Sequence, residues 1–209
     1  MKNWAIILFS ALLVPGLVYA APEFKENVHY ELVLPPQPTT TSGNKVEVVE
    51  MFWYGCPHCF HLEPYVNRWL KKKPANVEFV RIPAIFQPSW EMAARAYYTA
   101  EILGVLDKTH SAMFDAIHEL KKHFNSDADY QKFFEEHGVS ANDFKRVFRS
   151  FAVEAKIRRA KDMTERYGIN GVPSLIVNGK YRTGAQLAGS QSNIFRVVNY
   201  LVGLETTKK

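Results

Sequence analysis

The sequence predicts an α/β fold in which a block of helices interrupts a mixed sheet. Strand-like alternation over 45–53 is followed by helical periodicity over 57–72 and by a second strand over 77–82. From 88 to about 151 the pattern is helical only. A hairpin signal comes later, and two domains in series would leave that hairpin without a sheet to join. We therefore expect one α/β unit with an all-helical insertion.

The stretch 45–53 is expected to be the central strand of this sheet. Its side chains alternate between two largely apolar faces, with Val46, Val48, Glu50 and Phe52 on one and Glu47, Val49 and Met51 on the other. A strand that is apolar on both faces normally lies inside a sheet covered by helices. Residues 29–34 could add a short strand, which the prolines that follow must end.

Capping and turn signals indicate the remaining elements. Ser126 is followed three residues later by an aspartate, and this spacing predicts the start of a helix. A polar helix is expected over 154–167 and an amphipathic closing helix over 195–204. Between these two helices, Asn178-Gly179 separates two short strand-like runs, which is a strong signal for a β-hairpin.

Composition and charge exclude several classes of protein. Hydrophobic residues make up 47% of the chain and aromatic residues 13%, which is enough for a packed interior and argues against disorder. The formal net charge of +5 comes from scattered basic residues, apart from a run at 71–73. That run stands at an expected helix end, where it complements the helix dipole. We therefore expect no binding to nucleic acid.

The first 20 residues have the pattern of a secretory signal peptide. Lys2 precedes an almost unbroken apolar run over 5–18, and Val18-Tyr19-Ala20 is a small-x-small cleavage site. The apolar run is shorter than the ~20 residues that a membrane-spanning helix needs. We expect cleavage after Ala20, and a mature, soluble chain that works in the oxidising surroundings that exported proteins meet.

The only two cysteines, Cys56 and Cys59, are separated by Pro57 and His58. Such a short loop is a poor structural staple, because closing it restricts the unfolded chain by only roughly 2 kcal/mol, against ~3 for fifteen residues. The spacing favours a disulfide that opens and closes, in which one sulfur is attacked and its neighbour leaves. The pattern therefore indicates redox chemistry.

The expected position of Cys56 explains why its sulfur should be the reactive one. It falls between the central strand and the next helix, and Pro57 suits the first turn of that helix. The free N–H groups of a helix start favour a thiolate, and His58 can add a donor or a positive charge. Cys59, one helical turn further in, should be the less exposed partner. A stable Cys56 thiolate makes the disulfide a stronger oxidant.

These residues carry a resemblance to a known family. Glu50, Phe52 and the run Cys56-Pro57-His58-Cys59, together with Gly171-Val172-Pro173 and the all-helical insertion, resemble the DsbA family of bacterial periplasmic thiol–disulfide oxidoreductases. The resemblance covers essentially the whole mature chain.

The resemblance implies a thioredoxin fold with an inserted all-helical domain. The thioredoxin-like domain would consist of 21–86 and 152–209, and the insertion of 87–151, after a signal peptide at 1–20. The resemblance also implies donation of the Cys56–Cys59 disulfide to newly exported proteins, with reoxidation by the quinone-linked membrane protein DsbB. The cofactor would be the redox-active disulfide itself, with no metal, and the protein is expected to be a monomer.

Four further residues receive roles through the resemblance. Although X–Pro bonds are mostly trans, the family implies a cis bond between Val172 and Pro173, beside the cysteines. Backbone groups of Val172 could then pair with an extended substrate chain. The family also has an acid at the position of Glu50, with a proposed role in proton exchange with Cys59, and Arg81 on the adjacent strand could be its counter-ion.

Three alternatives stay open at this point. A metal site would draw on both cysteines and His58, but structural zinc usually needs four ligands. A disulfide isomerase or reductase could use the same scaffold, although such proteins often carry an added dimerisation domain. A pure binding or chaperone role would be indifferent to Cys56→Ser. The sequence leaves open the set of substrates, the redox potential, the identity of the reoxidant and any role of the connector 35–44.

Overall fold

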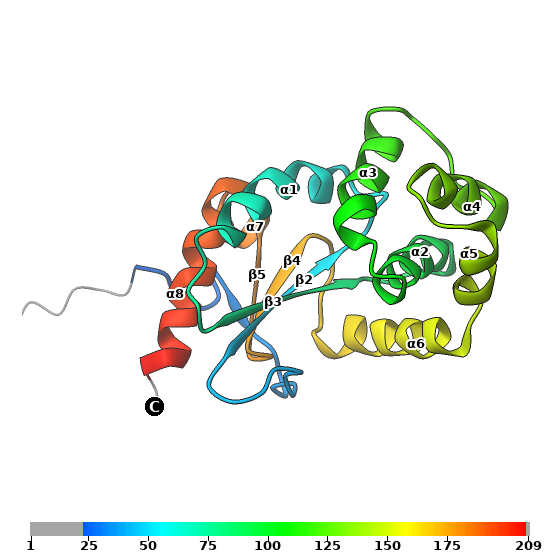
Figure 1. Ribbon diagram of the computed structural model, residues 1–209. Helices are drawn as coiled ribbons and strands as arrows, with labels where there is room; N and C mark the ends of the chain where they lie inside the picture. Colours follow the sequence, from blue (N-terminus) through cyan, green and yellow to red (C-terminus); the bar gives the residue numbers. More distant parts are fainter. Residues whose placement is uncertain (1–22, 208–209) are drawn as a thin grey trace, which may run out of the picture.

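The computed structural model describes residues 23–207, so the expected signal peptide and its cleavage site lie outside the described residues. The fold is built on a mixed five-stranded sheet with the strand order β1-β5-β4-β2-β3 (Figure 1). The strands are β1 (Glu31–Leu32), β2 (Val46–Phe52), β3 (Val77–Pro83), β4 (Ser174–Val177) and β5 (Tyr181–Gly184). Only β2 and β3 run parallel; the other neighbouring pairs are antiparallel. The mixed sheet is as predicted.

Helices cover the sheet and form a separate group beside it. They are α1 (Pro57–Leu70), α2 (Glu91–Ile102), α3 (Leu106–His118), α4 (Asp127–Glu136), α5 (Ala141–Phe148), α6 (Phe151–Arg166), α7 (Ala185–Ala188) and α8 (Ile194–Thr207), with short 3₁₀ turns at Pro88–Trp90 and Gln191–Asn193. In Figure 1, α1, α7 and α8 lie along one side of the sheet, while α2 to α5 stand together beyond its end. The predicted α/β unit with inserted helices is confirmed.

Strand β2 is the centre of the fold because both of its faces are buried. On one face, Val48 packs with Leu62 of α1 and Leu201 of α8. On the other face, Met51 packs with Tyr167, which caps the C-terminal end of α6. All seven residues of β2 are buried, including two glutamates. The predicted alternation of side chains between two covered faces is therefore confirmed.

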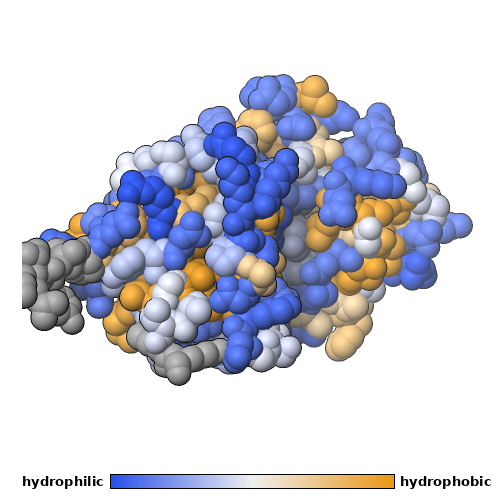
Figure 2. All heavy atoms as spheres, turned by 60° about the vertical axis from the view of Figure 1, so that its left-hand side comes forward, coloured by the Kyte–Doolittle hydropathy of each residue, from blue (hydrophilic) through white to orange (hydrophobic). Residues whose placement is uncertain are grey.

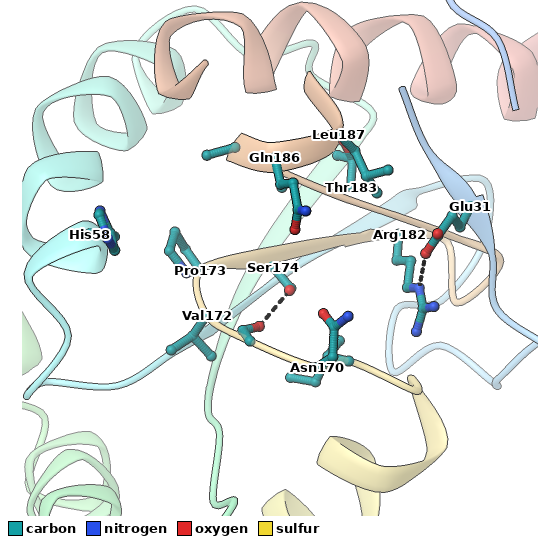
Figure 3. Close-up of a pocket in the computed structure, with 14 residues that line it drawn as sticks. Glu31, His58, Asn170, Val172, Pro173, Ser174, Arg182, Thr183, Gln186 and Leu187 are labelled. Atoms are coloured by element: carbon teal, nitrogen blue, oxygen red, sulfur yellow. Dashed lines mark hydrogen bonds and ion pairs between the residues drawn. The ribbon is translucent and has the colours of Figure 1, made fainter. Parts of the chain in front are cut away.

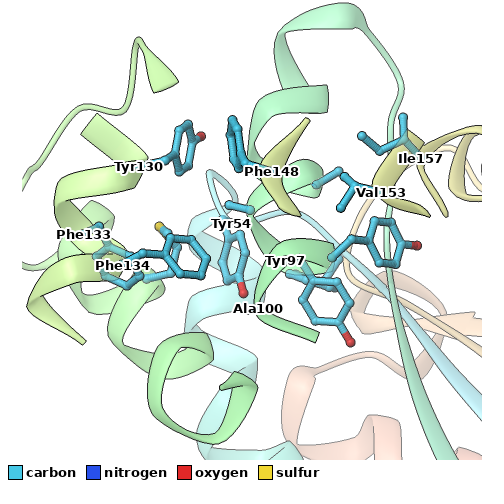
Figure 4. Close-up of a cluster of buried hydrophobic side chains, with 14 of the residues drawn as sticks. Tyr54, Tyr97, Ala100, Tyr130, Phe133, Phe134, Phe148, Val153 and Ile157 are labelled. Atoms are coloured by element: carbon cyan, nitrogen blue, oxygen red, sulfur yellow. The ribbon is translucent and has the colours of Figure 1, made fainter. Parts of the chain in front are cut away.

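The inserted helices enclose an aromatic core of their own. Figure 4 shows this cluster, to which Tyr54, two residues after β2, belongs together with aromatic residues of α2, α4 and α5. Helix α6 belongs to both cores, since Val153 and Ile157 lie in the aromatic cluster and Met163 lies against the sheet. The division of the chain at 151/152 thus stays a prediction, and α6 is the element that joins the two parts.

Local chemistry explains most element boundaries. Ser126 and Asp129 form a reciprocal capping box at the start of α4, as the spacing predicts. In the hairpin between β4 and β5, Asn178 and Gly179 have φ angles of 51° and 64°, and a Cβ at Gly179 would lie 2.0 Å from the carbonyl oxygen of Gln37. Two boundaries differ from expectation: only Glu31–Leu32 pair as β1, and α6 begins three residues early because Ser150 caps it.

The surface is largely hydrophilic on the face that Figure 2 presents, where hydrophobic residues form groups among hydrophilic ones. Within residues 23–207, no helix combines the length and the apolar character needed to cross a membrane.

Candidate active site

The two cysteines lie where β2 gives way to α1, as their sequence context predicts. Cys56 is the N-cap residue of α1 and Pro57 is its first residue. The backbone N–H of Cys56 donates to the carbonyl oxygen of Trp53 at 3.0 Å, which closes a turn before the helix begins. Both cysteines are free thiols in this structure. Cys56 is 7% exposed and Cys59 is fully buried, so Cys56 is the more accessible sulfur.

The two thiols have opposite electrostatic environments. A hydrogen bond from the Cys59 side chain lowers the pKa of Cys56 to about 6; burial opposes this, while the backbone N–H groups of Cys59 and His58 and the charge of His58 add to it. Burial raises the pKa of Cys59 well above its usual value, and the neighbouring Cys56 adds to this effect. Near neutral pH, Cys56 therefore carries the negative charge and Cys59 keeps its proton.

The segment before β4 lies against Cys56, although the two are far apart in sequence. The Val172–Pro173 peptide bond is cis, which agrees with the implication of the family resemblance. In its protonated form, the Cys56 thiol donates to the carbonyl oxygen of Val172 at 3.4 Å. Next to this contact is a cavity of ≈ 520 Å³, which His58 and Pro173 line on one side and Gln186 on the other (Figure 3). The cavity offers space for a second molecule beside the reactive sulfur.

Below the cysteines, a buried carboxylate faces a guanidinium. Glu50 and Arg81 are directly opposite in the β2–β3 register, and Arg81 Nε donates to Glu50 Oε2 at 3.0 Å. Burial raises the pKa of Glu50 to about 7; Arg81 opposes this rise, and the charge of Glu63 adds to it. The other oxygen, Oε1, has no hydrogen-bond partner among the described residues. The charge of Glu50 also raises the pKa of Cys59, so the two groups interact.

Comparison with known proteins identifies the family. The family model of the DSBA-like thioredoxin domain matches residues 47–195 of this sequence. The chain belongs to this family. The thiol:disulfide interchange protein DsbA of Pseudomonas syringae pv. tomato is 37% identical over 210 residues, which cover 98% of this chain and 96% of the relative. The corresponding protein of Burkholderia cepacia is 33% identical and is covered to 99%. The crystal structure of Pseudomonas aeruginosa DsbA superposes with a TM-score of 0.85 at 36% identity, covering 90% of this chain and 99% of that one.

Membership of the DsbA-like family gives this arrangement its chemistry. The protein is a thiol–disulfide oxidoreductase, and Cys56 and Cys59 are its CXXC pair. Enzymes of this family react through their own disulfide, without an added cofactor. Within residues 23–207, no group of three or more histidine, cysteine, aspartate or glutamate side chains is arranged to hold a metal ion.

The structure adds a buried polar network to the site that the sequence analysis missed. Arg81 also donates from Nη2 to Glu63 Oε1 at 3.1 Å. Glu63 in turn lies 3.4 Å from His110 Nε2, and His110 Nδ1 lies 2.9 Å from the hydroxyl of Tyr54. Burial acts to raise the pKa of Glu63, but the hydrogen bond with His110 and the charge of Arg81 together lower it. Glu63 is thus a carboxylate that competes with Glu50 for one guanidinium.

One of these missed residues had a sequence signal. Glu63 follows Cys59 by four positions in α1, and the same face carries Leu62 and Val66. A charge on the buried face of an amphipathic helix indicates a buried ion pair. His110 had no such signal, since it comes from the inserted helix α3 and reaches the site only through the tertiary fold. His61, on another side of α1, is exposed and takes no part in this network.

Proposed function

We propose that this protein is a dithiol oxidase, which donates its Cys56–Cys59 disulfide to newly exported proteins in the periplasm. The opposed pKa shifts of the two thiols carry this proposal, because they stabilise the reduced enzyme as a Cys56 thiolate. Stabilising the reduced form makes the disulfide more ready to accept two electrons. The reaction then runs in the direction of substrate oxidation. An isomerase or a reductase instead needs a disulfide that is a weaker oxidant.

The exchange follows from which sulfur is accessible. A substrate thiolate attacks Cys56 Sγ and the Cys56–Cys59 bond breaks, so that Cys59 leaves with the electron pair and a mixed disulfide remains. A second substrate thiolate then attacks the substrate sulfur of the mixed disulfide. Cys56 leaves as a stable thiolate, and the substrate keeps the new disulfide. The substrate loses two electrons, and the cysteine pair gains them.

The Glu50–Arg81 pair is proposed to transfer a proton to and from Cys59. When Cys59 leaves it is a buried thiolate, which burial strongly disfavours, so it must take up a proton. A carboxyl group with a pKa of about 7 can be protonated or ionised near neutral pH, as a proton donor and acceptor must be. The unpaired Oε1 of Glu50 is the oxygen available for this exchange. The hydrogen bond from Arg81 stabilises the ionised form of Glu50, so that this form is also populated near neutral pH.

Substrate chains are proposed to bind along the Val172–Pro173 segment. The carbonyl oxygen of Val172 lies 3.4 Å from Cys56 Sγ, so an extended substrate that pairs with Val172 would bring its sulfur to the reactive atom. The adjoining cavity, with Gln186 and Asn170 pointing into it in Figure 3, gives room for side chains of the substrate. Its mixed polar and apolar lining suits a broad set of sequences.

Reoxidation and location complete the proposal. A quinone-linked membrane protein of the DsbB kind would accept the electrons from the reduced pair, and the protein would act as a monomer after cleavage behind Ala20. The thioredoxin-like domain would comprise 21–86 and 152–209 and the insertion 87–151. The family and the apolar N-terminal run support this placement in the periplasm.

One experiment tests the direction of the reaction. The purified protein is equilibrated with defined ratios of reduced and oxidised glutathione, and its oxidised fraction is measured together with its ability to oxidise a reduced dithiol peptide. An oxidase should become reduced already at a low ratio of reduced to oxidised glutathione, and it should oxidise the peptide rapidly. If the protein instead holds its disulfide against glutathione as firmly as a reductase does, the proposed direction is wrong.

A further inference from the structure

Tyr54, two residues before Cys56, is held at both of its ends by one helix of the inserted domain. His118 Nε2 lies 2.8 Å from the backbone carbonyl oxygen of Tyr54. His110 Nδ1 lies 2.9 Å from the hydroxyl oxygen of the same tyrosine. Both histidines belong to α3, about two turns apart. The inserted domain therefore contacts the segment that leads into the reactive cysteine through hydrogen bonds as well as through apolar packing.

The peptide whose carbonyl oxygen His118 contacts joins Tyr54 to Gly55. A glycine is required at position 55 because a Cβ there would lie 2.3 Å from the Trp53 ring. Without a side chain at position 55, rotation of this peptide meets fewer steric limits than between two larger residues. The peptide also lies inside the turn that the bond from Cys56 N to Trp53 O closes. A hydrogen bond to its carbonyl oxygen selects one orientation of the whole turn.

Both sulfurs depend on how this turn is placed. The Cys56 sulfur is stabilised as an anion by the Cys59 side chain and by the first N–H groups of α1. The backbone of Trp53, at the other end of the turn, hydrogen-bonds to the Cys59 sulfur. A rotation of the Tyr54–Gly55 peptide would shift Cys56 relative to these donors. The thiolate would then lose part of its stabilisation.

We propose that His118 is a positioning residue for the redox reaction. By donating from Nε2 to the carbonyl oxygen of Tyr54, it holds the 53–56 turn so that Cys56 Sγ faces the first N–H groups of α1. His110 supports the same residue from its hydroxyl end. The inserted domain thereby takes part in setting the reactivity of Cys56, in addition to covering the site.

Two substitutions separate the hydrogen bond from the packing of the ring. The His118 ring stacks on Phe60, with centroids 5.0 Å apart and planes 12° from parallel. His118→Phe keeps an aromatic ring on Phe60 and loses the donor, whereas His118→Gln keeps a donor at the position of Nε2 and loses the ring. A matched control is His137→Phe, which removes a similar bond, from His137 to the Phe133 carbonyl oxygen, in α4.

The readouts are the pKa of the Cys56 thiol, from ultraviolet titration of the reduced protein, and the equilibrium constant with glutathione. We expect His118→Phe to raise that pKa and to weaken the oxidant about fivefold, the loss typical of one hydrogen bond. His118→Gln should stay close to the wild type, and His137→Phe should leave both readouts unchanged. A role limited to stability would lower the melting temperature without moving either readout.

Three results would overturn the proposal: unchanged readouts in His118→Phe, an equal shift in His137→Phe, or the same shift in His118→Gln as in His118→Phe. If His118→Phe does not fold, His118→Asn replaces it, because the shorter amide places its donor too far from the Tyr54 carbonyl oxygen. The proposal then requires the asparagine variant to shift both readouts and the glutamine variant to retain them.

Discussion

The outer and inner sides of the first turn of α1 present two chemically identical thiols in very different surroundings. On the outer side, Cys56 faces the Val172–Pro173 segment and the adjoining cavity, and helix N–H groups favour its anion. On the inner side, Cys59 is fully buried and interacts with Glu50, so its protonated form is favoured. The contrast teaches that two positions at the start of one helix are enough to give two cysteines different roles. Cys56 is the sulfur that the substrate attacks, and Cys59 is the sulfur that exchanges a proton.

The largest expected effect comes from removing either sulfur, and the two removals should differ in kind. Cys56→Ser leaves no accessible sulfur for a substrate to attack, so oxidation of a dithiol peptide should fall to the uncatalysed rate. Cys59→Ser keeps the attacked sulfur but removes its partner, so it should accumulate mixed disulfides with substrates. Mass spectrometry of each variant after incubation with the oxidised peptide shows the difference. Stable mixed disulfides on Cys56→Ser would reverse the assignment.

The second expected effect concerns the acidity of the two thiols. In the reduced protein, ultraviolet titration should show one thiolate that forms with a midpoint near pH 6, while the other thiol remains protonated through neutral pH. Because the hydrogen bond from Cys59 is the main cause of the low pKa of Cys56, Cys59→Ala should move that midpoint upward. A midpoint that stays near pH 6 in Cys59→Ala would show that the helix N–H groups and His58 are sufficient.

This division of roles was only partly accessible from the sequence. The CXXC spacing, the strand before it and Pro57 at the helix start were enough to predict which sulfur is outer and which is inner. The alternation along β2 also put Glu50 on a buried face, and the strand pairing of Arg81 followed from two adjacent strands. The roles of Val172 and Pro173 came from family resemblance alone, because a hairpin far along the chain carries no local sign of its contact with Cys56.

What the sequence analysis missed depends on long-range packing. His110 and His118 reach the site because α3 folds back against the end of β2, and helical periodicity does not indicate which helix of an insertion does so. Glu63 had a signal on the buried face of α1, but its partner Arg81 also pairs with Glu50, and such sharing is visible only in three dimensions. Local patterns therefore predicted the cysteines and their helix, whereas the surrounding polar network required the tertiary structure.

The third expected effect distinguishes two buried glutamates of β2. Glu50→Gln should slow peptide oxidation at pH 7 by roughly 10- to 100-fold, because it removes the group that supplies a proton to the leaving Cys59 thiolate. Glu47→Gln is the matched control, since Glu47 Oε2 accepts hydrogen bonds from the backbone N–H and hydroxyl of Thr40 on the other face of the sheet. Its rate should remain at the wild-type value. Equal rates for all three proteins would remove Glu50 from the mechanism.

Glu50 should also change how the free energy of unfolding depends on pH. Its pKa is about 7 in the folded protein against 4.5 in the unfolded chain, so its favourable contribution is complete below pH 4.5 and is lost as the pH rises to 7. At 1.36 kcal/mol per unit, the wild type should lose about 3 kcal/mol relative to Glu50→Gln over this range. Urea unfolding of both proteins at pH 4.5 and pH 8 measures the difference. A difference that does not change with pH would mean that Glu50 is already ionised at pH 4.5.

The smallest expected effect lies on the outer side, in the cavity beside Cys56. Gln186→Trp should fill part of the space that Gln186 enters without touching either sulfur. Peptide oxidation should therefore slow several-fold, mainly through a higher KM, while the equilibrium constant with glutathione stays the same, because glutathione is small and the thiol pKa values are unchanged. Gln131→Trp on α4, outside the cavity lining, controls for the added ring. If Gln186→Trp also shifts the equilibrium constant with glutathione, the cavity affects the cysteines themselves, and the outer side cannot be treated as a separate binding surface.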